Sequence, residues 1–296
     1  MKWRRRGGGR GVIDRRGQSG FRGGGFSGPV RIGGGLGLPT LLIIGIMILL
    51  NGGLGGAATD IDDPLDDLEG AGAPAQGPLD AADPDRRLVD FLKFLLNDTQ
   101  DFWSDTFEQS GRDYRRARLV LFEGATGSGC GGATEDIGPH YCPADENIYL
   151  DLDFFRELRD RFGAPGDFAQ AYVMAHEVGH HVQSLMGISD QVHREQQVDP
   201  DAANELSVRL ELQADCLAGV WAFTTYERNL LESGDLQEGL NAAAAVGDDR
   251  IQREATGSVD PESWTHGSSE QRMRWFNLGF ENGDPNTCDT FSTDAL

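Results

Sequence analysis

Cysteine is scarce in this chain, with four residues in 296, and no two of them show the C-x-x-C spacing of zinc fingers. The absence of that spacing argues against a zinc site built from thiolates. Basic residues are also few, because 26 Lys and Arg stand against 48 Asp and Glu. Nine of the basic residues precede Leu38, so the remainder of the chain is strongly acidic. We therefore expect two regions with different roles and no nucleic-acid partner.

Only one long hydrophobic run is present. No ionisable side chain occurs from Ile32 to Ala58, and the apolar centre extends from Leu38 to Leu50. Because a transmembrane helix needs about 20 such residues, residues 36–58 are predicted to anchor the chain in a membrane. A secretory signal peptide cleaved near Ala58 is the alternative, although the basic start is unusually long for one. The positive-inside rule then predicts a cytoplasmic N-terminus and a C-terminal domain in the periplasm or outside the cell.

The segments on either side of this run lack the hydrophobic periodicity of folded structure. Residues 1–35 are rich in Gly and Arg, and we expect a disordered basic tail that sets the topology and touches anionic lipid. Binding of RNA by this tail is a less favoured alternative. Residues 59–86 are rich in acids, Gly, Ala and Pro, which predicts a flexible linker. The folded domain is expected to occupy residues 87–296.

The four cysteines fit a location outside the cytoplasm. An even number of cysteines in an oxidising compartment favours disulfides. Three pairings are possible, and we prefer Cys130 with Cys142 and Cys216 with Cys288.

The most informative motif is His176-Glu177-Val178-Gly179-His180, an H-E-x-x-H pattern. We expect it on a buried helix over about 168–186, with Asp167 as the N-cap. On a helix, His176 and His180 share one face and can bind one metal ion. Glu177 then projects beside that ion, where a water molecule needs a base.

A third ligand is needed, because a catalytic zinc keeps three protein ligands and one open position. Glu211 lies on the next predicted long helix and can supply it. Asp215, four residues later on the same face, can accept a hydrogen bond from a ligand histidine and orient its ring. An exposed acidic face is the simpler interpretation of these two residues. We predict one Zn²⁺ per chain, held by His176, His180 and Glu211.

The motifs resemble a known group of enzymes. H-E-x-x-H followed by E-x-x-x-D is similar to the gluzincin pattern, and E-L-Q-A-D resembles the CaaX prenyl protease and heat-shock membrane zinc proteases. H-E-V-G-H-H-V-Q and E-L-Q-A-D-C-L-A-G-V-W look most like a bacterial family of membrane-anchored neutral zinc metallopeptidases. The resemblance implies that a strand at Ile148-Tyr149-Leu150 holds an extended peptide; an ordinary core strand is the alternative. The segment T-H-G-S-S-E-Q-R implies that His266 is a catalytic residue that stabilises an oxyanion; a capping or structural role for His266 and Arg272 is the alternative.

The expected fold is α+β and mainly helical, a zincin-like domain with a small sheet. Strands are predicted at 118–122 and 147–151, and helices from residue 88 onward and at 153–162, 168–186, 203–232, 236–246 and 268–281. The expected function is that of a membrane-anchored zinc endopeptidase acting on peptides or proteins. A binding or scaffold protein with a relic zinc site and a zinc hydrolase of non-peptide substrates are the alternatives.

Overall fold

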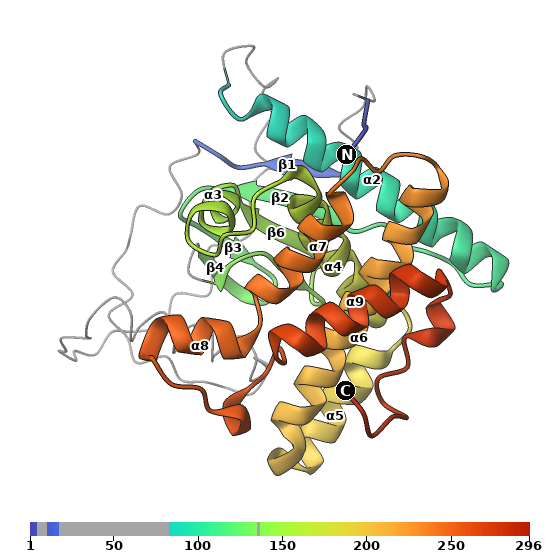
Figure 1. The fold of residues 1–296 in the computed structure, drawn as a ribbon. Helices are drawn as coiled ribbons and strands as arrows, with labels where there is room; N and C mark the ends of the chain where they lie inside the picture. Colours follow the sequence, from blue (N-terminus) through green and yellow to red (C-terminus); the bar gives the residue numbers. More distant parts are fainter. Residues whose placement is uncertain (5–10, 18–82, 135–136) are drawn as a thin grey trace, which may run out of the picture.

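A computed structural model describes residues 1–4, 11–17, 83–134 and 137–296 (Figure 1). The predicted anchor at 36–58 and most of the linker at 59–86 lie outside these residues. Within the described ranges, no helix combines the length and the hydrophobicity needed to cross a bilayer.

Helices form most of the domain, as the sequence predicts, so the mainly helical α+β class is confirmed (Figure 1). The helices are α2 (Arg86–Gln109), α3 (Asp153–Asp160), α4 (Asp167–Leu185), α5 (Ile188–Val198), α6 (Ala203–Glu227), α7 (Asp235–Ala245), α8 (Asp248–Thr256) and α9 (Ser269–Asn282). The predicted helix over 203–232 ends early, because Asn229 adopts a left-handed conformation with φ 56°. Helices α5 and α8 were not predicted from the sequence, because their polar sequences offer little hydrophobic periodicity.

In the part of the chain that the structure describes, the strands form one small sheet and one hairpin. The sheet order is β1-β2-β6-β5, with β1, β2 and β6 parallel and β5 antiparallel to β6. Its strands are β1 (Val12–Asp14), β2 (Arg118–Phe122), β6 (Asn147–Asp151) and β5 (His140–Cys142), and β3 (Ala125–Ser128) pairs with β4 (Gly131–Thr134) in the hairpin. Residues 119–122 of β2 and all of β6 are buried, which suits central parallel strands covered on both faces.

The N-terminal residues depart from the sequence expectation. Met1–Arg4 and Gly11–Gly17 belong to the folded domain, and Val12–Asp14 pairs with β2. The expectation of a disordered tail is wrong for these two segments. A three-residue strand carries almost no local signal, because its pairing partner supplies the stabilising contacts.

Close helix contacts hold the C-terminal half of the domain together. A Cβ atom on Gly219 of α6 would lie 2.0 Å from the Phe276 carbonyl oxygen, and one on Gly279 of α9 would lie 2.0 Å from that of Cys216. The two backbones can approach this closely only because both positions lack a side chain. The disulfides join Cys130 to Cys142 and Cys216 to Cys288, which is the pairing preferred from the sequence.

Candidate metal centre

The first half of the centre lies on α4, which is buried along most of its length. Asp167 does not cap this helix as predicted, since the N-cap is Gly166 and Asp167 is the first helical residue. Glu238 instead accepts the N–H of Phe168 at 3.0 Å. The second half lies on α6, and the two helices meet where Gly179 faces Ala214. A Cβ on Gly179 would lie 3.0 Å from the Ala214 carbonyl oxygen, so a small residue is needed there.

This contact brings His176, His180 and Glu211 together. The two histidine Nε2 atoms are 3.1 Å apart, and Glu211 places its carboxylate oxygens 3.2 Å from Nε2 of His176 and 3.3 Å from Nε2 of His180. Ligand atoms about 2.0–2.1 Å from a tetrahedral zinc are separated by about 3.3–3.4 Å. The three side chains therefore fit a zinc ion.

His176, His180 and Glu211 form a cluster. In each of the two histidine rings, a hydrogen bond at Nδ1 fixes Nε2 as the nitrogen that faces this cluster. Nδ1 of His176 donates to Asp215 at 2.8 Å, and Nδ1 of His180 donates to the side-chain oxygen of Gln183 at 2.9 Å. Both Nε2 atoms consequently carry lone pairs when the imidazoles are neutral. Two lone pairs and a carboxylate converge on one point, which is unfavourable without a cation between them.

Asp215 is fully buried and is held from three sides. Tyr172 donates its hydroxyl proton to Oδ1 at 2.5 Å, while Arg272 donates to Oδ2 at 2.8 Å and to Oδ1 at 3.0 Å. Arg272 also donates to the Tyr172 oxygen at 3.1 Å. The carboxylate is thus fixed before it receives the N–H of His176, which is the arrangement that orients a metal ligand.

Gln183 is oriented by a second chain of hydrogen bonds. Its amide nitrogen donates to the Leu210 carbonyl at 2.7 Å and to the Gln213 side-chain oxygen at 3.1 Å, so its oxygen must face His180. Gln213 in turn donates to the carbonyl of the disulfide-bonded Cys288 at 3.0 Å. The C-terminal segment therefore supports the ring of His180.

The charges of the cluster favour a cation. Burial alone would lower the pKa of His176, because it disfavours the charged imidazolium form. The nearby carboxylates of Asp215 and Glu211 have the larger effect and raise the pKa of His176 to about 10. Burial likewise opposes ionisation of Glu211, yet the imidazoles of His180, His266 and His176 bring its pKa well below the usual range. A proton or a metal ion is therefore stabilised at the same place, and the two compete for it.

Glu177 follows His176 on α4, and one of its carboxylate oxygens has no partner. The residue is 5% exposed, and its Oε2 is buried with no hydrogen bond from the protein. An unsatisfied buried carboxylate oxygen is unfavourable and is found where a ligand or water completes the site. Its position next to the first ligand histidine suits a group that accepts a proton from water.

His266 approaches the cluster from the loop before α9. Asp248 shapes this loop by accepting the backbone N–H groups of Thr265, His266 and Gly267 at 2.6–3.1 Å. The other Asp248 oxygen lies 3.2 Å from Nδ1 of His266. Burial lowers the pKa of His266, but Glu211 and Asp248 together raise it, so the ring can carry a proton near Glu211. The helix cap itself is Ser268, which forms a capping box with Gln271.

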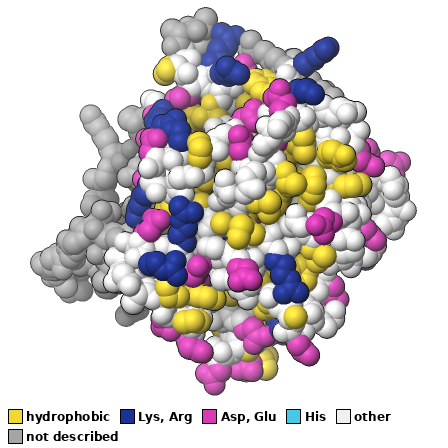
Figure 2. Space-filling model, in the orientation of Figure 1, with side chains coloured by type: hydrophobic (Ala, Val, Ile, Leu, Met, Phe, Trp, Pro, Cys, Tyr) yellow, Lys and Arg dark blue, Asp and Glu magenta, His cyan; other side chains and the backbone are white. Residues whose placement is uncertain are grey.

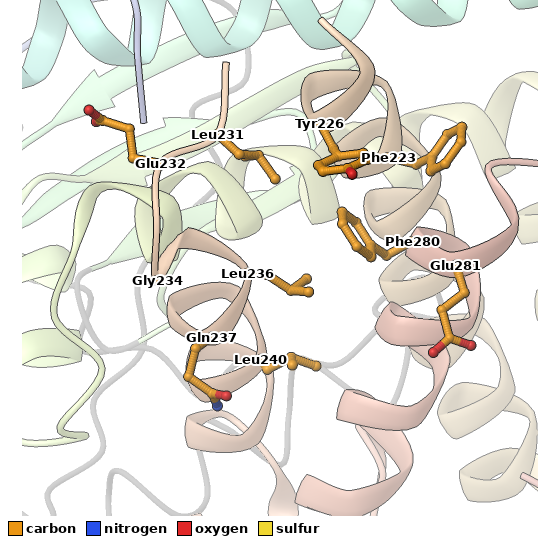
Figure 3. A pocket seen from close by; sticks show the side chains of 10 residues that line it. All are labelled: Phe223, Tyr226, Leu231, Glu232, Gly234, Leu236, Gln237, Leu240, Phe280 and Glu281. Carbon is orange, nitrogen blue, oxygen red and sulfur yellow. The ribbon is translucent and has the colours of Figure 1, made fainter. Parts of the chain in front are cut away.

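Two other features lie apart from the cluster. His181 is buried and faces away from the other two histidines, since it donates to the Arg115 carbonyl and accepts the hydroxyl proton of Tyr141 at 3.0 Å. An apolar hollow of about 740 Å³ lies between the end of α6, α7 and α9, and none of the cluster residues lines it (Figure 3). The side chains that line it include Phe223, Tyr226, Leu231, Leu236, Leu240 and Phe280. Figure 2 shows hydrophobic side chains across the middle of this face, among scattered charged ones.

His176, His180, Glu211 and Asp215, which the sequence predicted to share one site, come together in the structure, and Glu177 follows His176 on α4. The sequence did not predict the residues that support them, which are Tyr172, Gln183, Gln213 and Asp248. Spacing offered a signal for two of these. Tyr172 precedes His176 by one helical turn, and Gln183 follows His180 by three residues.

The comparisons with known proteins agree with this chemistry. A family model described as "Putative neutral zinc metallopeptidase" matches residues 1–291. The uncharacterized protein YpfJ of Escherichia coli is 44% identical over 296 residues, covering 98% of this chain and 99% of YpfJ. An uncharacterized protein of Mycobacterium tuberculosis is 50% identical over 194 residues, covering 62% of this chain and 65% of its own length. No solved structure matches the chain. The chain belongs to the neutral zinc metallopeptidase family.

Proposed function

We propose that the protein is a zinc-dependent endopeptidase, with His176, His180 and Glu211 as the metal ligands and Glu177 as the base. The observation that carries the proposal is the convergence of three candidate ligand atoms at tetrahedral spacing, on a helix where the residue after His176, Glu177, has a buried and unpartnered Oε2. His180 and Glu211 keep 16% and 12% of their side chains exposed, so the cluster remains accessible from one side. A structural zinc site is closed by four protein ligands, whereas a catalytic one keeps an open position.

A bound zinc ion would supply Lewis-acid activation of water and of the scissile carbonyl. Glu177 accepts the proton of the attacking water at its free oxygen and later passes it to the leaving amine nitrogen. His266, held at Nδ1 by Asp248, donates a hydrogen bond to the carbonyl oxygen as that oxygen becomes negative. Asp215 and Gln183 keep the two ligand imidazoles in the tautomer that faces the metal.

The strand that holds the peptide is β5 in this proposal, and the expectation for Ile148-Tyr149-Leu150 is wrong. Those residues lie in β6, which pairs with β2 on one side and with β5 on the other, so β6 has no free edge. β5 is the last strand of the sheet, and its Tyr141 contacts His181 of the metal-binding helix. A terminal strand can bind an extended peptide through main-chain hydrogen bonds.

The cysteines support a location of the domain outside the cytoplasm. All four form disulfides and none is free, and disulfides persist in oxidising compartments. This supports a catalytic domain outside the cytoplasm, in the periplasm or beyond the cell.

Variants of the purified full chain test the function. Glu177→Gln should retain about one zinc per chain and lose hydrolysis of an unfolded protein, because an amide cannot accept the water proton. His176→Ala and His180→Ala should lose zinc, since two ligands make a poor site. Glu227→Gln, an exposed residue on α6, is the matched control and should keep both zinc and activity.

The outcomes separate the alternatives. Near-normal hydrolysis by Glu177→Gln would exclude Glu177 as the base. A zinc-loaded wild type that leaves unfolded protein intact would favour a scaffold with a relic site, or a hydrolase of non-peptide substrates.

A further inference from the structure

The N-terminal strand β1 is built into the sheet of the catalytic domain. Val12, Ile13 and Asp14 pair in parallel with residues 119–121 of β2 (Figure 1). Leu119 donates its N–H to the Gly11 carbonyl at 2.7 Å, and Arg15 donates its N–H to the Leu121 carbonyl at 2.8 Å. Val12 is 6% exposed and belongs to the main core.

The arginines that follow β1 are used inside the fold. Arg15 donates to the Thr126 hydroxyl and the Gly127 carbonyl, both at 2.9 Å. Arg16 is 8% exposed and lies 2.8 Å from Asp14 and 2.7 Å from Asp83, which precedes α2. Asp83 lies beyond the apolar run in the sequence, so residues from both sides of that run form one ion-pair cluster.

The first residues of the chain dock at a second place. The N–H of Lys2 donates to the Leu230 carbonyl at 2.7 Å. The Trp3 ring lies 5.2 Å from that of Phe91 and 6.1 Å from that of Phe94, both on α2. We call the described residues 1–4 and 11–17 the N-terminal segment. Three separate contacts attach this segment to the domain, and they are made by residues 2–3, by β1 and by Arg16.

We propose that the N-terminal segment and the catalytic domain lie in the same compartment. Paired strands are about 4.8 Å apart, whereas the hydrocarbon core of a bilayer is about 30 Å thick. A single crossing of a membrane between Gly17 and Asp83 would put β1 and β2 on opposite sides, where they cannot pair. The N-terminal segment and the domain therefore lie on the same side of any membrane, against the opposite sides that the positive-inside rule predicted. If the domain lies outside the cytoplasm, as proposed above, the N-terminus lies outside it as well.

The charges agree with this inference. The positive-inside prediction treated the basic residues of the N-terminal segment as free to face the cytoplasm. Arg15 and Arg16 are instead bound to Thr126, Asp14 and Asp83. Transferring β1 to the other side of a membrane would break these contacts and expose the buried Val12.

Cysteine labelling in intact cells tests the proposal. Because no cysteine is free, one added cysteine can be labelled selectively by a membrane-impermeant maleimide. Lys2→Cys reports on the N-terminal segment, and Val198→Cys, at a residue that is 87% exposed, reports on the catalytic domain. Labelling is compared in intact cells, spheroplasts and lysed cells.

The expected result is that both cysteines react under the same conditions. If one reacts in spheroplasts while the other is protected until lysis, the proposal is overturned. Recovery of the catalytic domain on a shorter chain that has lost residue 2 also overturns it, and supports a cleaved signal peptide.

A stability measurement on the purified full chain gives an independent test. Val12→Asp would place a charge in the core and should lower the melting temperature by at least about 5 °C. Arg4→Asp changes charge at an exposed position of the same segment and should leave it unchanged. A Val12→Asp protein that melts like the wild type would show that β1 is not docked. Neither test depends on peptidase activity, so its outcome is separable from that of the proposed function.

Discussion

Replacing Arg272 by Met tests the buried ion pair that Arg272 forms with Asp215, next to the candidate metal ligand His176. In the wild type, Nε and Nη2 of Arg272 lie 2.8 and 3.0 Å from the two oxygens of Asp215, and both residues are almost fully buried. Burial raises the pKa of Asp215, but Arg272 and His176 together lower it below its usual value. Met fills a similar volume without the charge, so the Asp215 carboxylate stays buried but loses the positive charge and the hydrogen bonds of Arg272.

Removing one partner of a buried ion pair destabilises a protein by about 3–5 kcal/mol. We expect a loss of this size in the free energy of unfolding of Arg272→Met, measured by urea titration. Asp215 should also hold the ring of His176 less well, which lowers zinc affinity about 10–100-fold by competition with a chelating dye. Arg159→Met, at an exposed ion pair with Asp160, is the control and should unfold like the wild type.

The double variant that combines Arg272→Met with Asp215→Asn tests whether the two charges stabilise each other. Without either charge, no unpaired ion is buried, so the double variant should be more stable than the sum of the single losses predicts, by about 2 kcal/mol or more. Additive losses, or a loss below about 1 kcal/mol for Arg272→Met, would refute the claim that this pair stabilises the centre.

Two further predictions concern packing and pH. Gly279→Ala should destabilise the fold by about 3 kcal/mol or more, because the added methyl meets the Cys216 carbonyl; Gly127→Ala, which meets nothing within 4 Å, should be nearly neutral. Equal melting temperatures for the two variants would contradict the close approach of α6 and α9. The raised pKa of His176, about 10, means that protonation stabilises the metal-free fold fully below about pH 6.5, and that this contribution is lost as the pH rises toward 10. With a chelator, the melting temperature should therefore fall between pH 7 and pH 9.5. The zinc-loaded protein should not show this fall, and parallel pH curves for the two forms would contradict the assignment of His176.

The chemistry of the centre could be predicted from the sequence because it depends on short spacings. A helix places residues four apart on one face, so His176 and His180 meet wherever the helix lies, and Asp215 shares the face of Glu211. The expectation that the four cysteines form two disulfides also needed only their even number and an oxidising compartment. None of these inferences required knowledge of how the elements pack.

The supporting contacts were decided by tertiary structure. Arg272 reaches Asp215 across 57 positions of sequence, and Gln183 faces His180 only because Leu210 and Gln213 hold its amide. The orientation of these side chains depends on how α4, α6 and α9 pack, which no local pattern encodes.

Strand pairing is the clearest example of a feature that no local sequence pattern encodes. The sequence predicted two strands correctly but placed the peptide-holding edge on β6 and treated residues 1–35 as disordered. Which strand lies at an edge depends on its neighbours, and β1 is a strand because β2 supplies its partners. The sequence by itself therefore determined which side chains can form the candidate metal centre, because their spacing on a helix is local. The tertiary structure decided the sheet order and the position of the N-terminal segment, because strand pairing joins residues that are distant in the chain.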